Sequence, residues 1–552
     1  MADYELKSLN LPKLTGTALK AFAAAVENSL TRSLLLPGLL ENGGIPKLRR
    51  ITLDEPPTFI PLVQADAPAD PPVAFEPGVA PTNFPYRTAR DYTAAYRAGT
   101  LGPVEAAENV LAAISASEQG EAPLRAFIAV YPEDVLAQAR SAALRLKSGL
   151  SLSPLDGVPV AIKDEIDMKP YPTTVGTRFL GKAPVIEDST VAARLRASGA
   201  ILVGKTNMHE IGINPNGANA NHGAVRNPFN PACDPGGSSS GSAAAVAAGL
   251  VPLAIGADGG GSIRIPAGLC GLGGLKPTFA RGSEAGAAPL CWSVAHLGPL
   301  ATCVEDAALA YSLIAGPDPR MPESRSQPPV TLAGWNNPDL HGLRLGVYRQ
   351  WFEHASPEVV QVCQAMLEQL KRAGAEILPV TIPGLDEIRI AHAITILSEM
   401  AAAMHPYRLQ RSLQGAAVRL SLVLGEATTA EDYIQAQQVR TRALATFRKV
   451  FEQVDAILTP ATALAAQPIP LAGLKDGWSD LGTDTEMMRF VFPSNFTGNP
   501  AISFPAGYDG RGLPIGMQAI GRHWDEALLL RIAYTAEQSL SRRKPARFYK
   551  VF

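Results

Sequence analysis

The sequence has no excess of charge of either sign and few cysteines. The formal net charge is −2 at pH 7 over 552 residues, so the chain has no overall basic field of the kind that nucleic-acid-binding proteins present. The five cysteines are scattered along the chain without a C-x-x-C pair or another metal-ligand spacing. This favours small buried residues in a reducing compartment over disulfides or a zinc site. We therefore expect no nucleic acid partner, no metal and no other cofactor.

Long hydrophobic runs are also missing. The N-terminus, MADYELKSLNLPK, has no basic segment followed by an apolar one, as a secretory signal would have. The longest apolar run, from Ser242 to Ile255, is too short to cross a bilayer and is interrupted by Pro252. We expect a cytoplasmic protein without signal peptide or transmembrane helix, associated with a membrane at most through its surface.

Histidine is missing from the sequence around Ser262, a candidate nucleophile in a glycine-rich motif. None of the eight histidines lies within thirty residues of Ser262, in the stretch GADGGGSIRIP. A nucleophilic serine usually passes its proton to a histidine, so a catalytic Ser262 needs another base. The preceding Gly259, Gly260 and Gly261 place consecutive N–H groups beside its hydroxyl, which is typical of an oxyanion hole or an anion-binding nest. A flexible glycine turn with an incidental serine is the alternative.

What is present supports a large folded protein in three zones. Hydrophobic residues make up 46% of the chain and charged residues 18%, enough for a substantial core. Residues 1–64 form a predicted N-terminal helical cap region, residues 65–85 with six prolines a connector, and residues 86–552 the main domain. In the first zone, helical spacing predicts an amphipathic helix from Thr17 to Leu36 that stops at Pro37-Gly38; its stripe is Leu19, Phe22, Val26 and Leu30.

Strand and helix patterns alternate from residue 86 onward. Strands are predicted within 157–163, 200–205, 341–350 and 375–383, and helices within 104–114, 188–199 and 356–374. This alternation is typical of an α/β fold with a largely parallel sheet.

Two further features could carry chemistry. Residues 237–241, GSSSG, match the G-x-S-x-G elbow, which would make Ser239 a nucleophile with a histidine partner. A loop rather than a strand precedes it, and His523 is the best available partner, so a serine-capped helix start is the favoured interpretation. Lys163 ends the apolar strand GVPVAIK; desolvation favours a neutral amine, which could act as a general base. Alternatively, Lys163 turns to solvent beside the acids that follow it.

Three features, taken in their order along the chain, resemble the signature of the amidase signature enzymes. They are a lysine at the end of a strand, then Gly-Gly-Ser-Ser, then Gly-Gly-Ser-Ile-Arg-x-Pro. The spacing is 75 positions from Lys163 to Ser238 and 24 from Ser238 to Ser262. The resemblance implies the amidase signature fold: a large mixed, mostly parallel twisted sheet flanked by helices on both faces, here with an N-terminal helical extension and a signature core at about 157–280. It also implies a Ser-Ser-Lys triad, in which Ser262 forms the acyl-enzyme, Ser238, after a cis peptide bond, passes the proton, and Lys163 receives it.

The resemblance implies supporting residues as well. The N–H groups of Gly259, Gly260, Gly261 and Ser262 would hold the oxyanion, and Gly212 would rim the acyl pocket. Asp258, Arg264 and Ser239 would support the nucleophile loop. One position departs from the family: Ala257 stands where a threonine is usual, so a hydroxyl that supports the serine network is missing.

Within this family the chain is most similar in pattern to plant-type fatty acid amide hydrolases. The similar segments are KLTGTALKAF, ITLDEPPTF, GGSSSGS, ADGGGSIRIP and KPARFY. The resemblance implies hydrolysis of N-acylethanolamines or other lipid amides to a fatty acid and an amine, and a homodimer. The N-terminal helix could then cap the acyl channel, touch a membrane or form the dimer contact, or simply pack as core.

Three alternatives remain open. The triad does not choose the acyl group, so the substrates could be small, aryl or urethane amides. The chain could also be a noncatalytic subunit or binding protein on an amidase fold, although an intact Lys163, Ser238 and Ser262 argue against it. The subunit of the glutamine-dependent amidotransferase is a further relative, to which the N-terminal zone fits poorly.

Overall fold

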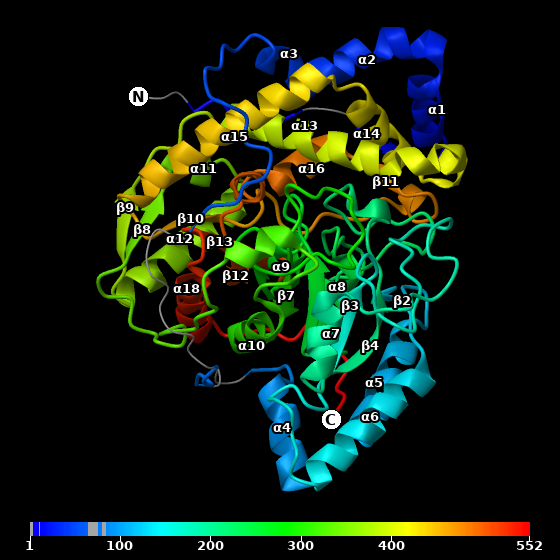
Figure 1. Cartoon of the computed structure of the whole chain (residues 1–552), viewed down its shortest axis with the longest axis vertical. Helices are drawn as coiled ribbons and strands as arrows, with labels where there is room; N and C mark the ends of the chain where they lie inside the picture. Colours follow the sequence, from blue (N-terminus) through cyan, green and yellow to red (C-terminus); the bar gives the residue numbers. More distant parts are fainter. Residues whose placement is uncertain (1–3, 10–11, 65–74, 80–83) are drawn as a thin grey trace.

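The computed structural model describes residues 4–9, 12–64, 75–79 and 84–552. At its centre, within these residues, lies an 11-stranded sheet in the order β2-β4-β3-β5-β7-β6-β12-β13-β10-β8-β9 (Figure 1). Its strands are β2 (Phe127–Ala129), β3 (Pro159–Lys163), β4 (Ile201–Thr206), β5 (Leu253–Ala257), β6 (Gly273–Lys276), β7 (Leu297–Ala301), β8 (Arg344–Val347), β9 (Glu376–Pro379), β10 (Ala456–Pro460), β12 (Ala501–Tyr508) and β13 (Pro514–Gly521).

The sheet is mixed, with its parallel pairs on the two flanks. The strands β4-β3-β5 on one side and β10-β8-β9 on the other pair in parallel. The strands between these groups pair antiparallel, and so does the edge strand β2 with β4. Parallel neighbours need a crossover connection, whereas antiparallel neighbours such as β12 and β13 need only a hairpin. The expected large mixed sheet is therefore confirmed, and parallel pairing describes its flanks, where strand and helix patterns alternate in the sequence.

Helices flank the sheet in two groups. One consists of α8 (Ser240–Ala247) and α9 (Arg264–Cys270), which contact each other and the sheet. In the other, neighbouring helices contact one another in turn: α7 (Thr190–Ala197), α10 (Val304–Ile314), α18 (Glu526–Gln538) and α12 (Pro357–Arg372). Other helices of the main domain are α4 (Ala89–Ala98), α5 (Pro103–Ser117), α6 (Pro132–Lys147), α11 (Arg349–Phe352), α16 (Leu481–Met488) and α17 (Phe492–Thr497).

The N-terminal helices lie at one end of the molecule, at the top of Figure 1. They are α1 (Gly16–Glu27), α2 (Ser29–Gly43) and α3 (Ile45–Leu48), and they join α13 (Leu385–Met404), α14 (Ala416–Glu426) and α15 (Ala430–Phe451). Helix α1 contacts α14, and α3 contacts α13 and α15. The short β1 (Leu14–Thr15) pairs antiparallel with β11 (Trp478–Ser479). The first zone is thus packed onto a helical layer formed by distant parts of the chain.

The predicted single helix over 17–36 is wrong in two respects. The chain breaks at Asn28, whose extended backbone ends α1 and whose side chain accepts the Leu30 N–H to cap α2. Helix α2 then continues through Pro37 and ends at Gly43, before Gly44 in the left-handed region with φ 85°. A proline removes one intrahelical hydrogen bond and strains the preceding turn, but it does not force a helix to end.

Other expected elements are confirmed. Helix α7 lies within the predicted 188–199, with the Ser189 hydroxyl accepting the Ala192 N–H and Gly199 following at φ 88°. The five cysteines are buried and free. Most of the predicted connector at 65–85 lies outside the described residues; within the described part, Phe75 stacks on Trp335 with ring centroids 5.8 Å apart.

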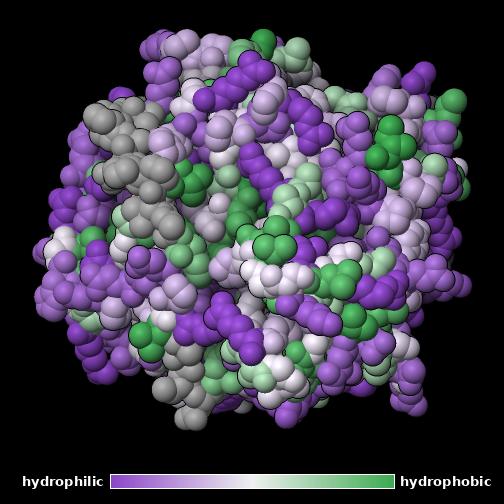
Figure 2. Space-filling view, turned by 60° about the horizontal axis from the view of Figure 1, so that its bottom comes forward, coloured by the Kyte–Doolittle hydropathy of each residue, from purple (hydrophilic) through white to green (hydrophobic). Residues whose placement is uncertain are grey.

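The surface is of mixed polarity. On the face shown in Figure 2, hydrophobic residues gather in small groups separated by hydrophilic ones. Among the described residues, no helix combines the length and the hydropathy that crossing a membrane requires. The same residues contain no cluster of three or more His, Cys, Asp or Glu side chains suited to a metal ion.

Candidate active site

Lys163 is buried at the end of β3. All five residues of this strand are buried, and the lysine side chain is 1% exposed. Its Nζ lies 2.8 Å from the Ser238 Oγ, 3.2 Å from the Ala257 carbonyl oxygen and 3.1 Å from a carboxylate oxygen of Glu165. The alternative in which this lysine turns to solvent is therefore excluded.

Ser238 is held tightly in the turn before α8. The Gly237–Ser238 peptide bond is cis, as the resemblance implies. The Gly237 N–H donates to the Pro215 carbonyl at 2.9 Å, and the His209 N–H donates to the Ser238 carbonyl at 3.1 Å. A Cβ at Gly237 would lie 2.2 Å from the carbonyl oxygen of Asn216, so no larger residue fits there.

Ser262 lies between β5 and α9 and is 9% exposed. Its carbonyl accepts the Ser239 N–H at 3.2 Å, which ties the two serine-bearing segments together. In the part of the chain that the structure describes, no group hydrogen bonds to the Ser262 hydroxyl. The structure therefore joins Lys163 to Ser238 but does not close a hydrogen bond from Ser238 to Ser262; catalytic hydrogen bonds often tighten only when substrate binds.

The glycines before Ser262 divide into two kinds. The Gly261 N–H donates to the Asp258 carboxylate at 2.6 Å, so this N–H group already has a hydrogen-bond acceptor within the loop. For Gly259, Gly260 and Ser262, no hydrogen bond of the N–H group occurs among the described residues. Gly261 has φ 109°, and a Cβ there would lie 2.4 Å from a Val491 methyl group, so the loop conformation requires glycine.

A buried ion pair braces this loop. Arg264 and Asp258 are both fully buried and lie 3.0 Å apart, and the Asp258 carboxylate also accepts the Ile263 N–H at 3.0 Å. Burial alone would raise the pKa of Asp258, but the adjacent Arg264 guanidinium holds it well below its ordinary value. The carboxylate therefore stays charged and fixes the loop backbone.

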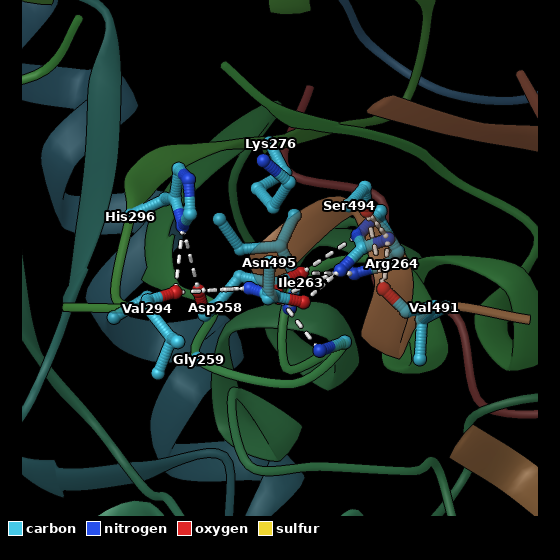
Figure 3. Close-up of polar contacts among 12 residues, drawn as sticks. Asp258, Gly259, Ile263, Arg264, Lys276, Val294, His296, Val491, Ser494 and Asn495 are labelled. Atoms are coloured by element: carbon cyan, nitrogen blue, oxygen red, sulfur yellow. Dashed lines mark hydrogen bonds and ion pairs between the residues drawn. The ribbon is translucent and has the colours of Figure 1, made fainter. Parts of the chain in front are cut away.

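Residues from the C-terminal part of the chain complete the brace (Figure 3). The Arg264 guanidinium donates to the Val491 carbonyl at 3.0 Å, to the Ser494 hydroxyl at 2.6 Å and to the Gln518 side chain at 2.6 Å. The Asn495 amide donates to the Asp258 carbonyl at 2.8 Å and to its carboxylate at 2.9 Å. Every charged atom of the pair is thus satisfied without water.

Two histidines contact the nucleophile loop, and sequence reasoning missed both. His392 of α13 bonds through Nε2 to the Gly259 carbonyl at 2.9 Å, and His296 contacts the Asp258 carbonyl through Nδ1 at 3.3 Å and the Val294 carbonyl at 2.8 Å. Burial lowers the pKa of His392 to about 4, so the ring is neutral and must carry its hydrogen on Nε2 to donate. No pattern marks His392, which is 133 positions from Gly259 on an apolar helix.

Ser239 is poorly placed to be the nucleophile. It is fully buried, and its hydroxyl donates to the Ala257 carbonyl at 3.2 Å. His523, its best histidine partner by sequence, bonds through Nε2 to the Thr497 carbonyl at 2.8 Å. The hydroxyl of Ser239 and the amine of Lys163 both use the backbone of Ala257, where the family usually has a threonine.

Gly212 lies beside both Ser238 and Glu165. Its φ is 70°, and a Cβ there would lie 3.3 Å from the Ser238 Oγ and 3.6 Å from a Glu165 carboxylate oxygen. The predicted pocket-rim residue is therefore next to the triad, on the side of Ser238 and the Glu165 carboxylate.

Comparisons with known proteins place this chain among amidases. The family model described as Amidase matches residues 108–530. The chain is 38% identical to a fatty acid amide hydrolase of Medicago truncatula, over 99% of this chain and 96% of that protein. A solved structure from work on the origins of an s-triazine catabolic enzyme is similar with a TM-score of 0.77 and 30% identity, covering 83% of this chain and all of the other. A peptide amidase bound to chymostatin gives a TM-score of 0.73 and 30% identity, covering 84% of this chain and 99% of the other.

Proposed function

The chain belongs to the amidase family and is an amide-hydrolysing enzyme, and on this premise we propose that it works through a Ser262–Ser238–Lys163 triad and an acyl-enzyme. The observation that carries this proposal is the 2.8 Å contact of the buried Lys163 amine with the Ser238 hydroxyl. Among the described residues no histidine hydrogen bonds to the Ser238 hydroxyl, and the two whose rings reach the nucleophile loop bond there to backbone carbonyls.

Proton transfer follows the order of these groups. As Ser262 Oγ attacks the substrate carbonyl, its proton passes to Ser238 while the Ser238 proton passes to the neutral Lys163 amine. The resulting ammonium returns a proton through Ser238 to the leaving nitrogen, the C–N bond breaks and the amine departs. Water then attacks the ester to Ser262 by the same route and releases the acid.

In this proposal the oxyanion of the tetrahedral intermediate binds to the N–H groups of the loop that have no acceptor among the described residues. These are the N–H groups of Gly259, Gly260 and Ser262; Gly261 would contribute only if it left the Asp258 carboxylate. Each such donor is worth about 3 kcal/mol to the transition state. Asp258 and Arg264 keep these groups aligned, and Ser239 supports them through its N–H contact with Ser262.

The proposed substrates are fatty acid amides, in particular N-acylethanolamines. Similarity to the Medicago truncatula enzyme over nearly the whole of both chains supports this class over small, aryl or urethane amides. His392 belongs to α13, in the helical layer formed by α13, α14 and α15, and the N-terminal helices α1 and α3 pack against this layer. We also propose that the chain is divided into an N-terminal part at 1–64, a connector at 65–85 and an amidase domain at 86–552. In this proposal the N-terminal part caps the acyl site. The protein would form a homodimer and contact membranes at most peripherally.

An active-site label tests the triad. A fluorophosphonate should label Ser262, and Ser262→Ala should abolish labelling while Ser239→Ala, the matched control, retains it. Lys163→Ala should lower turnover about 100- to 10,000-fold because the serine loses its base. Labelling at Ser239, or normal turnover without Lys163, would contradict the triad.

A series of ethanolamides of rising acyl length tests the substrate class. The ratio kcat/KM should increase with acyl length, because each methylene buried adds about 0.8 kcal/mol of binding. The Ser262→Ala variant provides the background rate. A preference for short or aryl acyl groups would replace the lipid-amide proposal with that of a small-molecule amidase.

A further inference from the structure

Glu165 lies beside the proposed base and has no place in the triad. It is two residues after Lys163, in the turn that follows β3, and its side chain is 10% exposed. Its backbone is fixed, because its carbonyl accepts the Ala288 N–H at 2.8 Å and the next N–H, of Ile166, donates to the Lys163 carbonyl at 3.1 Å. The carboxylate is therefore presented to the amine by ordered backbone on both sides.

The neighbouring acid, Asp164, points to a different lysine. Its carboxylate lies 3.7 Å from the amine of Lys205 and accepts the Gly176 N–H at 2.9 Å. Of these two consecutive acids, Glu165 is thus the one paired with Lys163.

The three partners of the Lys163 amine define its orientation. The Ala257 carbonyl and the Glu165 carboxylate can only accept hydrogen bonds, whereas the Ser238 hydroxyl can donate or accept. A neutral amine has two N–H groups and one lone pair. When its two N–H groups point to the two pure acceptors, the lone pair is left facing the Ser238 hydroxyl, at 2.8 Å.

We propose that Glu165 is a positioning residue for the proton relay, which aims the Lys163 lone pair at Ser238 and stabilises the ammonium that forms there. This inference rests on the proposed triad. Glu165 neither gains nor loses a proton: the proton from Ser238 moves to Lys163, and the carboxylate at 3.1 Å faces the new positive charge. It acts on lysine as the aspartate of a serine-protease triad acts on histidine.

A second carboxyl, Glu284, interacts electrostatically with Glu165. Burial, reinforced by the charge of Glu165, raises the pKa of Glu284 well above its ordinary value, so Glu284 is neutral. Gly212 leaves room beside both groups, since a Cβ there would lie 3.6 Å from a Glu165 carboxylate oxygen and 3.3 Å from the Ser238 Oγ.

The test compares two isosteric changes in the full-length enzyme. Glu165→Gln should lower kcat on an amide about 10- to 100-fold with KM nearly unchanged, because it removes the charge and leaves the shape. Glu284→Gln, the matched control, replaces a group that is already neutral and should keep the wild-type kcat. On an ester with the same acyl group Glu165→Gln should lose less, because an alcohol leaves without the proton that an amine needs.

A double-mutant cycle distinguishes a role through Lys163 from a merely structural one. In a Lys163→Ala background, Glu165→Gln should cause no further loss of kcat, because there is no amine left to orient. Glu165→Asp, which keeps the charge, should retain more activity than Glu165→Gln at equal thermal stability. An equal loss from Glu165→Gln with and without Lys163, or wild-type kcat in Glu165→Gln, would overturn the inference; full activity of Lys163→Ala alone would instead overturn the triad.

Discussion

At the scale of single residues, a lysine at the end of a buried strand does not by itself mark a base. Lys163, Lys205 and Lys276 end or nearly end β3, β4 and β6, and all three side chains are buried. Lys205 contacts the Ile166 carbonyl at 2.7 Å, and Lys276 contacts the Asn499 carbonyl at 2.6 Å. Neither contact is to a serine.

Motif spacing therefore separated Lys163 from the other two lysines, and local sequence could not. Ser238 and Ser262 of the proposed triad could be named because they belong to short, glycine-rich motifs, and Lys163 could be named from its spacing to them. Glu165, His392 and Asn495 could not, because their roles depend on contacts formed by folding, across 133 positions from Gly259 in the case of His392. Glu165 is adjacent in sequence, but nothing in the pattern KDEID distinguishes it from the other acids there.

Gly212 provides a residue-scale prediction. Gly212→Ala should cost about 1–2 kcal/mol of stability for its positive φ and lower kcat about 10-fold or more, because the new methyl would lie 3.3 Å from the Ser238 Oγ. Gly99→Ala is the control: it has φ 66° and nothing within 4 Å of the added Cβ. Thermal melts and steady-state kinetics on both variants would show a shared loss of stability and a loss of kcat at Gly212 alone. Equal kcat in the two variants would mean that a methyl group at position 212 does not displace the Ser238 hydroxyl.

At the scale of elements, the periodicity of hydrophobic residues predicted where helices lie but not where they end. The stripe predicted over 17–36 was right for Leu19 and Val26, which are fully buried, but Leu30 is 81% exposed because the chain turns at Asn28. The sheet shows the same limit. Alternating strands and helices revealed its parallel flanks, whereas the antiparallel centre depends on pairings between strands far apart in sequence, such as β6 with β12.

The two leucines give a matched test of how the N-terminal zone is attached. Leu19→Ala should cost about 2–5 kcal/mol, because Leu19 is buried against Ala416 and Ala417 of α14, and it should make α1 more sensitive to protease. Leu30→Ala should change stability by less than about 0.5 kcal/mol, since an exposed side chain loses little when truncated. Denaturant unfolding and limited proteolysis measure both. Equal effects from the two would mean that α1 is not anchored through Leu19.

At the scale of the whole molecule, several buried carboxyls make stability depend on pH. Asp484 of α16 is buried beside Asn216, whose amide donates to it at 3.1 Å, and Asp234 lies in the same small pocket. Burial, with added repulsion from Asp480 and Asp234, raises the pKa of Asp484 to about 7. Because this value is above that of the unfolded chain, the neutral acid favours folding at low pH, and this contribution is lost as the pH rises from about 4 through 7.

Asp484→Asn should therefore be more stable than the wild type at pH 8, by about 2–4 kcal/mol at most, and should differ little from it at pH 4. The substitution keeps the acceptor for Asn216. Asp54→Asn, at an exposed side chain, is the control and should follow the wild type between pH 4 and 8. Free energies of unfolding at these pH values measure the difference. If Asp484→Asn kept the wild-type dependence on pH, the carboxylate would have to be hydrated in the folded protein.

The brace around Arg264 has a consequence for biosynthesis. A ribosome adds Lys163, Ser238 and Ser262 in the first half of the chain, together with Asp258, which neutralises Arg264. The other side-chain and backbone acceptors of the guanidinium arrive only with residues 491–518. Until then a nascent chain would have to bury Arg264 with part of its N–H groups unpaired, which is unfavourable. Ser262 therefore acquires its final surroundings only near the end of translation, and a product that ends between residues 263 and 490 would contain all three residues of the proposed triad and is expected to be inert.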